Sequence, residues 1–165
     1  MKAVAYCDGS GNSGYGACAC TIEILNGSYL EFAELLGEVS NNTAEYRGVQ
    51  LAIIRALENG VTELVINTDS QVIERQLRGV YMCKQPHLKV LRDETWEMAE
   101  VFEKIEIRWI RREQNARADQ LCREIQREPG ARRKPIRNDR KEFVDADEAR
   151  FFTYEEIERI QDERA

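Results

Sequence analysis

The stretch KAVAYCDGSG, residues 2–11, opens with strand-forming residues and closes on a turn-forming Asp-Gly-Ser-Gly sequence. Its first part, residues 2–8, predicts a β-strand that ends at Asp8. Residues 15–25 alternate between the two faces of a second strand. The Asn26-Gly27 pair that follows is a strong hairpin signal, so residues 29–36 are expected to return antiparallel. The chain therefore begins with three consecutive strands.

Helical and strand patterns follow one another in the rest of the chain. Apolar residues at helical spacing predict helices over about residues 43–59, 70–77, 88–102 and 118–125. Residues 63–67 are typical of a short buried parallel strand, and residues 105–110 alternate as a strand. His87 is expected in a surface loop after Pro86. This order predicts an α/β protein with a mixed sheet flanked by helices.

The composition divides the chain into one domain and an appendage. The 165 residues, of which 42% are hydrophobic, suffice for one domain with a buried core, placed at residues 1–128. Residues 129–141 carry six basic residues against one acid, and residues 142–165 carry nine acids against three bases. The sequence from Thr153 to Glu156 has capping-box form and predicts a short helix over about 154–163. The apolar residues of this tail suggest that it docks on something.

Composition also indicates the cellular compartment in which the protein is expected. No apolar run is long enough to span a membrane, and the first residues form a strand-like segment instead of a signal peptide. The five cysteines have no framework spacing, so free thiols in a reducing, cytoplasmic setting are expected. A formal net charge of −6 does not by itself indicate a nucleic-acid binder, but the charge is unevenly distributed.

Four acidic residues lie far apart, each inside a short polar motif: Asp8, Glu45, Asp69 and Asp119. Each has an ordinary structural explanation. Asp8 suits a strand-to-turn junction, and Glu45 would complete a capping box if Asn42 capped its helix. Asp69 could cap a helix itself, and Asp119 would favour a helical first turn electrostatically.

The four acids together support a different interpretation. Magnesium takes oxygen ligands, and a two-metal site needs several carboxylates from different chain segments. Two of the acids would end neighbouring strands, where open α/β sheets place their sites, and the other two would lie on the first and last long helices. The pattern predicts a metal-dependent phosphodiester hydrolase.

The motifs around these acids resemble those of type 1 ribonucleases H. The matching text is YCDGS at 6–10 with GYGA at 14–17, SNNTAE at 40–45, NTDSQ at 67–71 and NARAD at 115–119. The similarity covers roughly residues 1–128. It implies an RNase H-like α/β fold, with a five-stranded mixed sheet flanked by helices whose first three strands are antiparallel, here followed by the C-terminal tail. It also implies endonucleolytic cleavage of the RNA strand of RNA–DNA hybrids.

The resemblance also implies roles for single residues. Asp8, Glu45, Asp69 and Asp119 would hold two Mg²⁺ ions, with Mn²⁺ as an alternative, and Asp8 would bridge them. The products would carry a 5′-phosphate and a 3′-hydroxyl. The remaining matched positions would contact the hybrid: the amides in its minor groove, Ser40 on a DNA phosphate, and the Gly9–Gly11 backbone on the RNA strand. These substrate-binding positions are Gly9, Ser10, Gly11, Ser40, Asn41, Asn42 and Gln71.

Two features depart from the family pattern. Residues 111–114 contain no histidine, which many members carry before the last Asp, and Arg112 or Glu113 would have to substitute. Residues 79–86 are a short loop with Lys84 as its one base, where many members have a basic helix-loop that grips DNA. The basic stretch 129–141 would then contact phosphates. The alternatives are a solvated linker, or an acidic C-terminal end that folds back and masks the basic stretch.

Other functional classes and assemblies remain open. One is a nuclease of the same fold that acts on double-stranded RNA or branched DNA, and another is a non-catalytic hybrid-binding module. The expected partner is an RNA–DNA hybrid, with no membrane association. A monomer is expected, and self-association or partner docking through the C-terminal tail is the alternative.

Overall fold

The computed structural model describes residues 1–11 and 15–127 of the chain. The expected domain boundary at 128, the basic linker at 129–141 and the helix expected at about 154–163 lie outside the described residues.

A mixed sheet of five strands forms the centre of the protein, as the family resemblance implies. The spatial order is β3-β2-β1-β4-β5. The first three strands pair antiparallel, whereas β4 pairs parallel with β1 and β5 pairs parallel with β4. The strands are β1 Lys2–Ser10, β2 Gly16–Ile24, β3 Tyr29–Gly37, β4 Glu63–Thr68 and β5 Lys104–Trp109.

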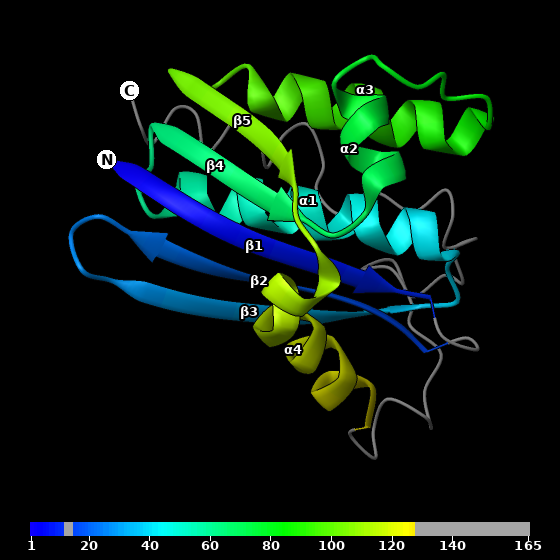
Figure 1. Cartoon of the computed structure of the whole chain (residues 1–165), viewed down its shortest axis with the longest axis horizontal. Helices are drawn as coiled ribbons and strands as arrows, with labels where there is room; N and C mark the ends of the chain where they lie inside the picture. Colours follow the sequence, from blue (N-terminus) through cyan, green and yellow to red (C-terminus); the bar gives the residue numbers. More distant parts are fainter. Residues whose placement is uncertain (12–14, 128–165) are drawn as a thin grey trace, which may run out of the picture.

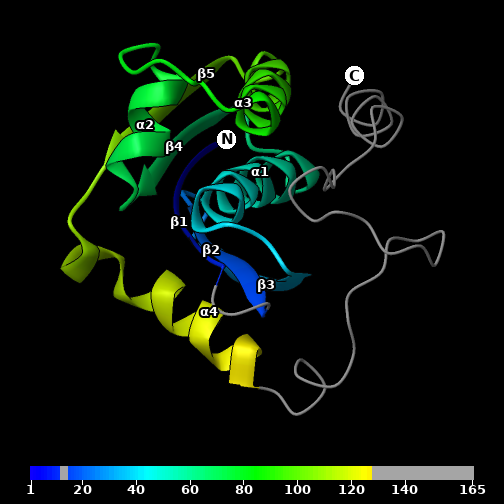
Figure 2. The same cartoon turned by 90° about the vertical axis from the view of Figure 1, so that its right-hand side faces the viewer.

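Helices cover both faces of this sheet. Figure 2 shows α1 and α4 on opposite faces, with α3 beside α1. Figure 1 shows α2 and α3 beside β5 at one edge of the sheet, whereas α4 lies toward the opposite edge. The helices are α1 Asn41–Glu58, α2 Gln71–Leu77, α3 Pro86–Ala99 and α4 Ala116–Arg127, the last preceded by a 3-10 helix, η2, at Arg112–Asn115.

Helix α1 is buried along most of its length because it lies between the sheet and α3. Its apolar residues at helical spacing pack into the core, as their spacing predicts. Two polar side chains are buried with them: the Arg47 guanidinium donates to Gln50 at 3.1 Å, and the Gln50 amide donates to Thr95 on α3 at 3.2 Å. This helix is therefore held from two sides, which fixes the residues that it presents at its N-terminus.

Several boundaries differ from the sequence-based expectation by up to three residues, and the starts of α1 and α3 have an identifiable cause. Helix α1 begins at Asn41 instead of residue 43, because the Ser40 hydroxyl accepts the Thr43 amide at 3.2 Å and caps the helix. Helix α3 begins at Pro86, so the expectation that His87 lies in a surface loop is wrong. Proline suits the first turn because its ring fixes φ near the helical value. His87 therefore sits half-buried in that turn.

Candidate metal centre and active site

Asp8 and Asp69 come together because of the register between two parallel strands. Cys7 on β1 is paired with Thr68 on β4, so the acid that follows each residue lies at the same edge of the sheet. This edge is the carboxyl end of both strands, where α/β sheets commonly place their sites. Asp8 is 8% exposed and therefore nearly enclosed. The expected placement of two acids at the ends of neighbouring strands is confirmed.

Glu45 reaches the same place because two glycines let α1 approach β1 closely. A Cβ on Gly9 would lie 2.1 Å from the Ala44 carbonyl oxygen, and one on Gly48 would lie 2.6 Å from the Asp8 carbonyl oxygen. Both positions therefore require glycine for this packing. The resulting backbone contact places the first turns of α1 directly against the end of β1, and Glu45 lies on that part of the helix.

The capping explanations for Glu45 and Asp69 are wrong. Ser40 caps α1, so Glu45 lies in the second turn and not at the third helical position after an Asn42 cap. Ser70 caps α2 by accepting the Ile73 amide at 3.3 Å, which leaves Asp69 outside that helix. Neither carboxylate is therefore used to begin a helix.

Three carboxylates form one cluster that is suited to a cation. Ligand oxygens of Asp8, Glu45 and Asp69 all lie within 4.8 Å of one another. Burial, followed by the charge of Asp69, raises the pKa of Asp8 from 3.8 to about 8, although the Gly9 amide opposes the shift. Burial raises the pKa of Glu45 to about 7, against a hydrogen bond from Ser70. Hard divalent cations prefer such oxygen ligands, so these residues fit Mg²⁺ or Mn²⁺.

Asp119 lies near this cluster but is not one of its three mutually close members. It sits in the first turn of α4, half-buried, and forms an ion pair with Arg123 one turn later. Its charge still contributes to the raised pKa of Asp8, so it acts on the cluster electrostatically. The structure thus brings three of the four predicted acids into contact range and holds the fourth beside them.

Asn115 was not among the predicted site residues, although it opens the motif that contains Asp119. Asn115 is 1% exposed, and its side-chain amide donates to the Cys7 carbonyl at 2.8 Å and to the Asp69 carboxylate at 3.3 Å. It therefore connects the ends of β1 and β4 to the start of α4. An Asn near an acid suggests a cap or a turn from sequence alone, and only the fold reveals that it is buried.

The other candidate substrate residues lie at the end of β1 and directly after it, and at the starts of α1 and α2. Asn41 accepts the Gly11 amide at 2.8 Å, which connects the N-terminus of α1 to the segment after β1. Ser40 and Asn41 are exposed, whereas Asn42 and Ser10 are half-buried and Gly9 is buried. Gln71 is exposed at the start of α2, where its side-chain oxygen accepts from the Arg75 guanidinium at 2.8 Å.

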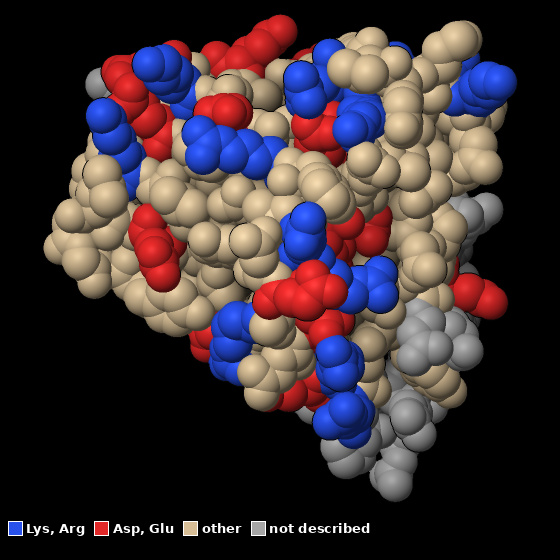
Figure 3. All heavy atoms as spheres, in the orientation of Figure 1, with Lys and Arg blue, Asp and Glu red and all other residues tan. Residues whose placement is uncertain are grey.

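Acidic and basic residues are mixed on the side of the protein that carries α4. Figure 3 shows acidic and basic side chains interleaved over α4 and the adjoining strand ends. Arg112 on η2 is one of the bases near the cluster, because its charge opposes the rise in the pKa of Glu45. The segment before Asp119 therefore places a guanidinium close to a candidate ligand.

Comparison with known proteins connects this fold and site to one family. Residues 6–125 match the model of a family described as reverse transcriptase-like. A ribonuclease HI of Halobacterium salinarum is 30% identical over 123 residues, which are 73% of this chain and 62% of that protein. The crystal structure of RNase H1 from that archaeon has a TM-score of 0.72 and 28% identity, and the match covers 75% of this chain and 96% of that one.

Two further relatives add context. LC11-RNase H1, crystallised in complex with an RNA/DNA hybrid, has a TM-score of 0.68 and 29% identity over 74% of this chain and 94% of that one. A bifunctional protein of Mycobacterium tuberculosis is 32% identical over 127 residues, which are 74% of this chain. The chain spans only 35% of the length of that mycobacterial relative. No helix among the described residues is long and apolar enough to cross a membrane.

Proposed function

The chain belongs to the ribonuclease H family, and we propose that it is an endonuclease that hydrolyses the RNA strand of RNA–DNA hybrids with divalent metal ions. The observation that carries the proposal is the cluster of Asp8, Glu45 and Asp69, whose ligand oxygens lie within 4.8 Å of one another. A cluster of buried acids with raised pKa values is costly unless a cation neutralises it.

Asp8, Glu45, Asp69 and Asp119 would hold two Mg²⁺ ions, with Mn²⁺ as the alternative. When bound, such ions lower the pKa of an attacking water and stabilise the charge on the leaving 3′-oxygen. Hydrolysis of this kind leaves a 5′-phosphate and a 3′-hydroxyl.

The residues around the cluster prepare it for this chemistry. Asn115 holds the Asp69 carboxylate through its amide, and Ser70 donates to the Glu45 carboxylate. The guanidinium of Arg112 and the Gly9 amide both favour the ionised forms that a cation requires. These groups orient the ligands without neutralising them completely, which leaves charge available for metal.

The hybrid is proposed to bind along the rim formed by the α1 start, the end of β1 and the α2 start. Amides at Asn41, Asn42 and Gln71 can donate and accept hydrogen bonds in a minor groove without reading sequence. Ser40 is proposed to contact a DNA phosphate. The Gly9–Gly11 backbone is proposed to meet the RNA strand. The hydrogen bond from Gly11 to Asn41 supports this reading because it joins the two segments that would meet opposite strands.

A strand-resolved cleavage assay tests the proposal. Each strand of a hybrid is labelled in turn, Mg²⁺ is added, and matched DNA and RNA duplexes and a branched DNA serve as controls. We expect cleavage of the RNA strand of the hybrid alone. Cleavage of the RNA duplex or of a branched DNA would instead identify a nuclease with another substrate. Hybrid binding without cleavage would identify a non-catalytic module.

A pair of variants separates chemistry from folding. Asp69→Asn removes one ligand charge from the cluster and should abolish turnover while the far-ultraviolet circular dichroism stays unchanged. Asp93→Asn makes the same substitution at an exposed position of α3 and should retain activity. Persistent cleavage by the Asp69 variant would show that the wrong acids had been assigned.

A further inference from the structure

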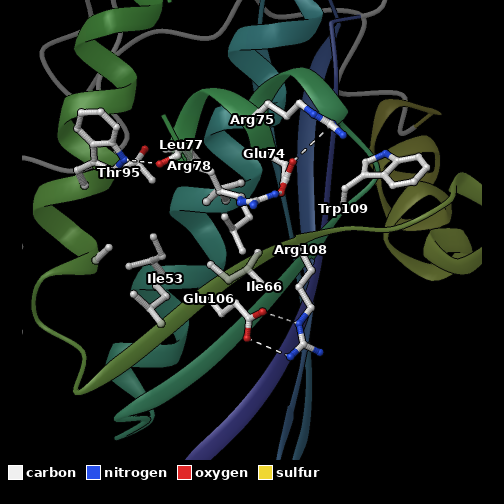
Figure 4. Close-up of a pocket in the computed structure, with 15 residues that line it drawn as sticks. Ile53, Ile66, Glu74, Arg75, Leu77, Arg78, Thr95, Glu106, Arg108 and Trp109 are labelled. Atoms are coloured by element: carbon white, nitrogen blue, oxygen red, sulfur yellow. Dashed lines mark hydrogen bonds and ion pairs between the residues drawn. The ribbon is translucent and has the colours of Figure 1, made fainter. Parts of the chain in front are cut away.

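A cavity of about 760 Å³ opens between α2, α3 and β5, outside the acidic cluster. Its floor is apolar and is formed by isoleucines of α1, β4 and β5, including Ile53 and Ile66 (Figure 4). Helix α2 and the residue that caps its C-terminus supply one wall with Glu74, Arg75 and Arg78. β5 forms the edge of the sheet, so no further strand of the described part covers this side. Apolar surface in such a hollow favours an occupant.

The rim of the cavity carries three guanidinium groups. Arg78 binds Glu74 at 2.8 Å, and Arg108 binds Glu106 through two bonds of 2.9 and 3.0 Å. Arg75 lies 4.0 Å from Glu74 and also donates to the Gln71 side-chain oxygen at 2.8 and 3.1 Å. A guanidinium has five N–H donors, so each of these arginines keeps donors that these contacts do not use. The rim thus offers directed hydrogen bonds to carboxylates around an apolar floor.

Both tryptophans of the chain line the same cavity. The Trp96 ring nitrogen donates to the Leu77 carbonyl at 2.8 Å, and that of Trp109 donates to the Asp69 carbonyl at 3.2 Å. The two residues are 40% and 44% exposed, respectively. Large aromatic faces that are half open to solvent gain most from an apolar partner. The fitting occupant is therefore an apolar segment that also carries several acids.

The chain itself contains such a segment beyond the described residues. Residues 151–163 read FFTYEEIERIQDE, with five acids against one base and apolar residues interleaved among them. Residue 151 lies 24 residues past Arg127, the last described residue. Such a connection can span about 80 Å when extended, whereas a domain of this size has a radius of gyration of about 14 Å. Reach therefore does not limit the contact.

We infer that residues 151–163 of this chain occupy the cavity between α2, α3 and β5, with their apolar side chains on its isoleucine floor and their carboxylates on its arginine rim. This arrangement corresponds to the general mode in which an amphipathic segment lies in a hydrophobic groove. It is independent of the proposed nuclease activity, because none of the candidate metal ligands lines the cavity.

Acrylamide quenching of tryptophan fluorescence in the full chain tests the inference, because the proposed occupant contains no tryptophan. A variant with Phe151→Asp and Phe152→Asp should release the segment and raise the Stern–Volmer constant roughly twofold, since both indoles lose a covering partner. Phe143→Asp is the matched control: it lies outside the proposed segment and should leave the constant unchanged. Circular dichroism confirms that each variant is folded.

Charge reversal provides a second, independent measurement. Arg108→Glu should raise the quenching constant, and adding Glu155→Arg with Glu156→Arg to the same chain should restore protection. Equal quenching of the wild-type chain and of the double Phe variant would overturn the inference. Protection that disappears on dilution would also overturn it, because a second copy of the chain would then be the occupant.

Discussion

Replacing Asp8 by Asn should stabilise the metal-free protein at alkaline pH and leave its stability nearly unchanged at acid pH. Burial and then the charge of Asp69 raise the pKa of Asp8 to about 8 from its ordinary value of 3.8. Between these two pH values the folded chain binds a proton that the unfolded chain releases. The free energy of unfolding therefore falls as the pH rises through this window. The metal-free protein is therefore least stable above this window, where the cluster is ionised and no cation neutralises it.

The magnitude follows from the geometry of the cluster. Its ligand oxygens lie within 4.8 Å of one another. Two unit charges at that separation repel by about 3.5 kcal/mol at an effective dielectric constant near 20. The variant removes this repulsion, while an amide oxygen can still accept the Gly9 N–H. We expect a gain of about 3 kcal/mol in the free energy of unfolding near pH 9. In a domain of this size the gain corresponds to about 10 °C in Tm.

Thermal unfolding in the presence of a chelator, followed by circular dichroism near pH 4 and pH 9, measures the effect. Asp93→Asn is the control, because it removes the same charge from an exposed site whose ion pair with Arg92 should contribute less than about 1 kcal/mol. Adding Mg²⁺ near pH 9 should raise the Tm of the wild-type protein and not that of the Asp8 variant. Equal stabilisation of the Asp8 variant at both pH values would refute the reasoning.

Three further predictions concern packing around the site. Gly48→Ala should displace α1 from β1, because the added Cβ would lie 2.6 Å from the Asp8 carbonyl oxygen. The variant should lose about 3 kcal/mol in the free energy of unfolding and should lose Mg²⁺-dependent activity. Denaturant unfolding and a Mg²⁺ titration of activity measure the two effects. Asn115→Ala should cost about 2 kcal/mol and weaken Mg²⁺ binding measured by calorimetry, whereas unchanged affinity would deny Asn115 a positioning role. Ellman's reagent should react slowly with the thiols of the native protein and promptly after unfolding, because burial raises the thiol pKa values. Rapid reaction of any thiol in the native protein would contradict the burial of Cys7, Cys18, Cys20, Cys83 and Cys122.

The sequence was sufficient to predict the order and type of the main elements. The hairpin at Asn26-Gly27 forms as expected, and its Gly27 adopts the positive φ of 97° that this turn requires. The short apolar run of β4 does pair parallel with β1. These features were predictable because they depend on local periodicity and turn chemistry. The boundaries of α1 and α3 were not, since a cap or a helix-starting proline moves a boundary by one or two residues.

The candidate site was only partly predictable. Asp8 and Asp69 were expected at neighbouring strand ends, and the structure places them there. The sequence left open whether Glu45 caps a helix or faces a metal, because both need an acid near a helix start. Packing decides the question: Gly9 and Gly48 bring α1 against β1, and Ser40 takes over the cap.

The sequence by itself determined which chemistry the chain can carry, since four acids in four recognisable motifs indicate metal-dependent hydrolysis of a phosphodiester. Only the tertiary structure decided how those acids are arranged. Three of them meet, Asp119 pairs with Arg123 beside them, and Asn115 bonds to both strand ends. The bonds from Asn115 join residues 46 and 108 positions apart in the chain. Such contacts depend on strand register and burial, which no local pattern of residues records.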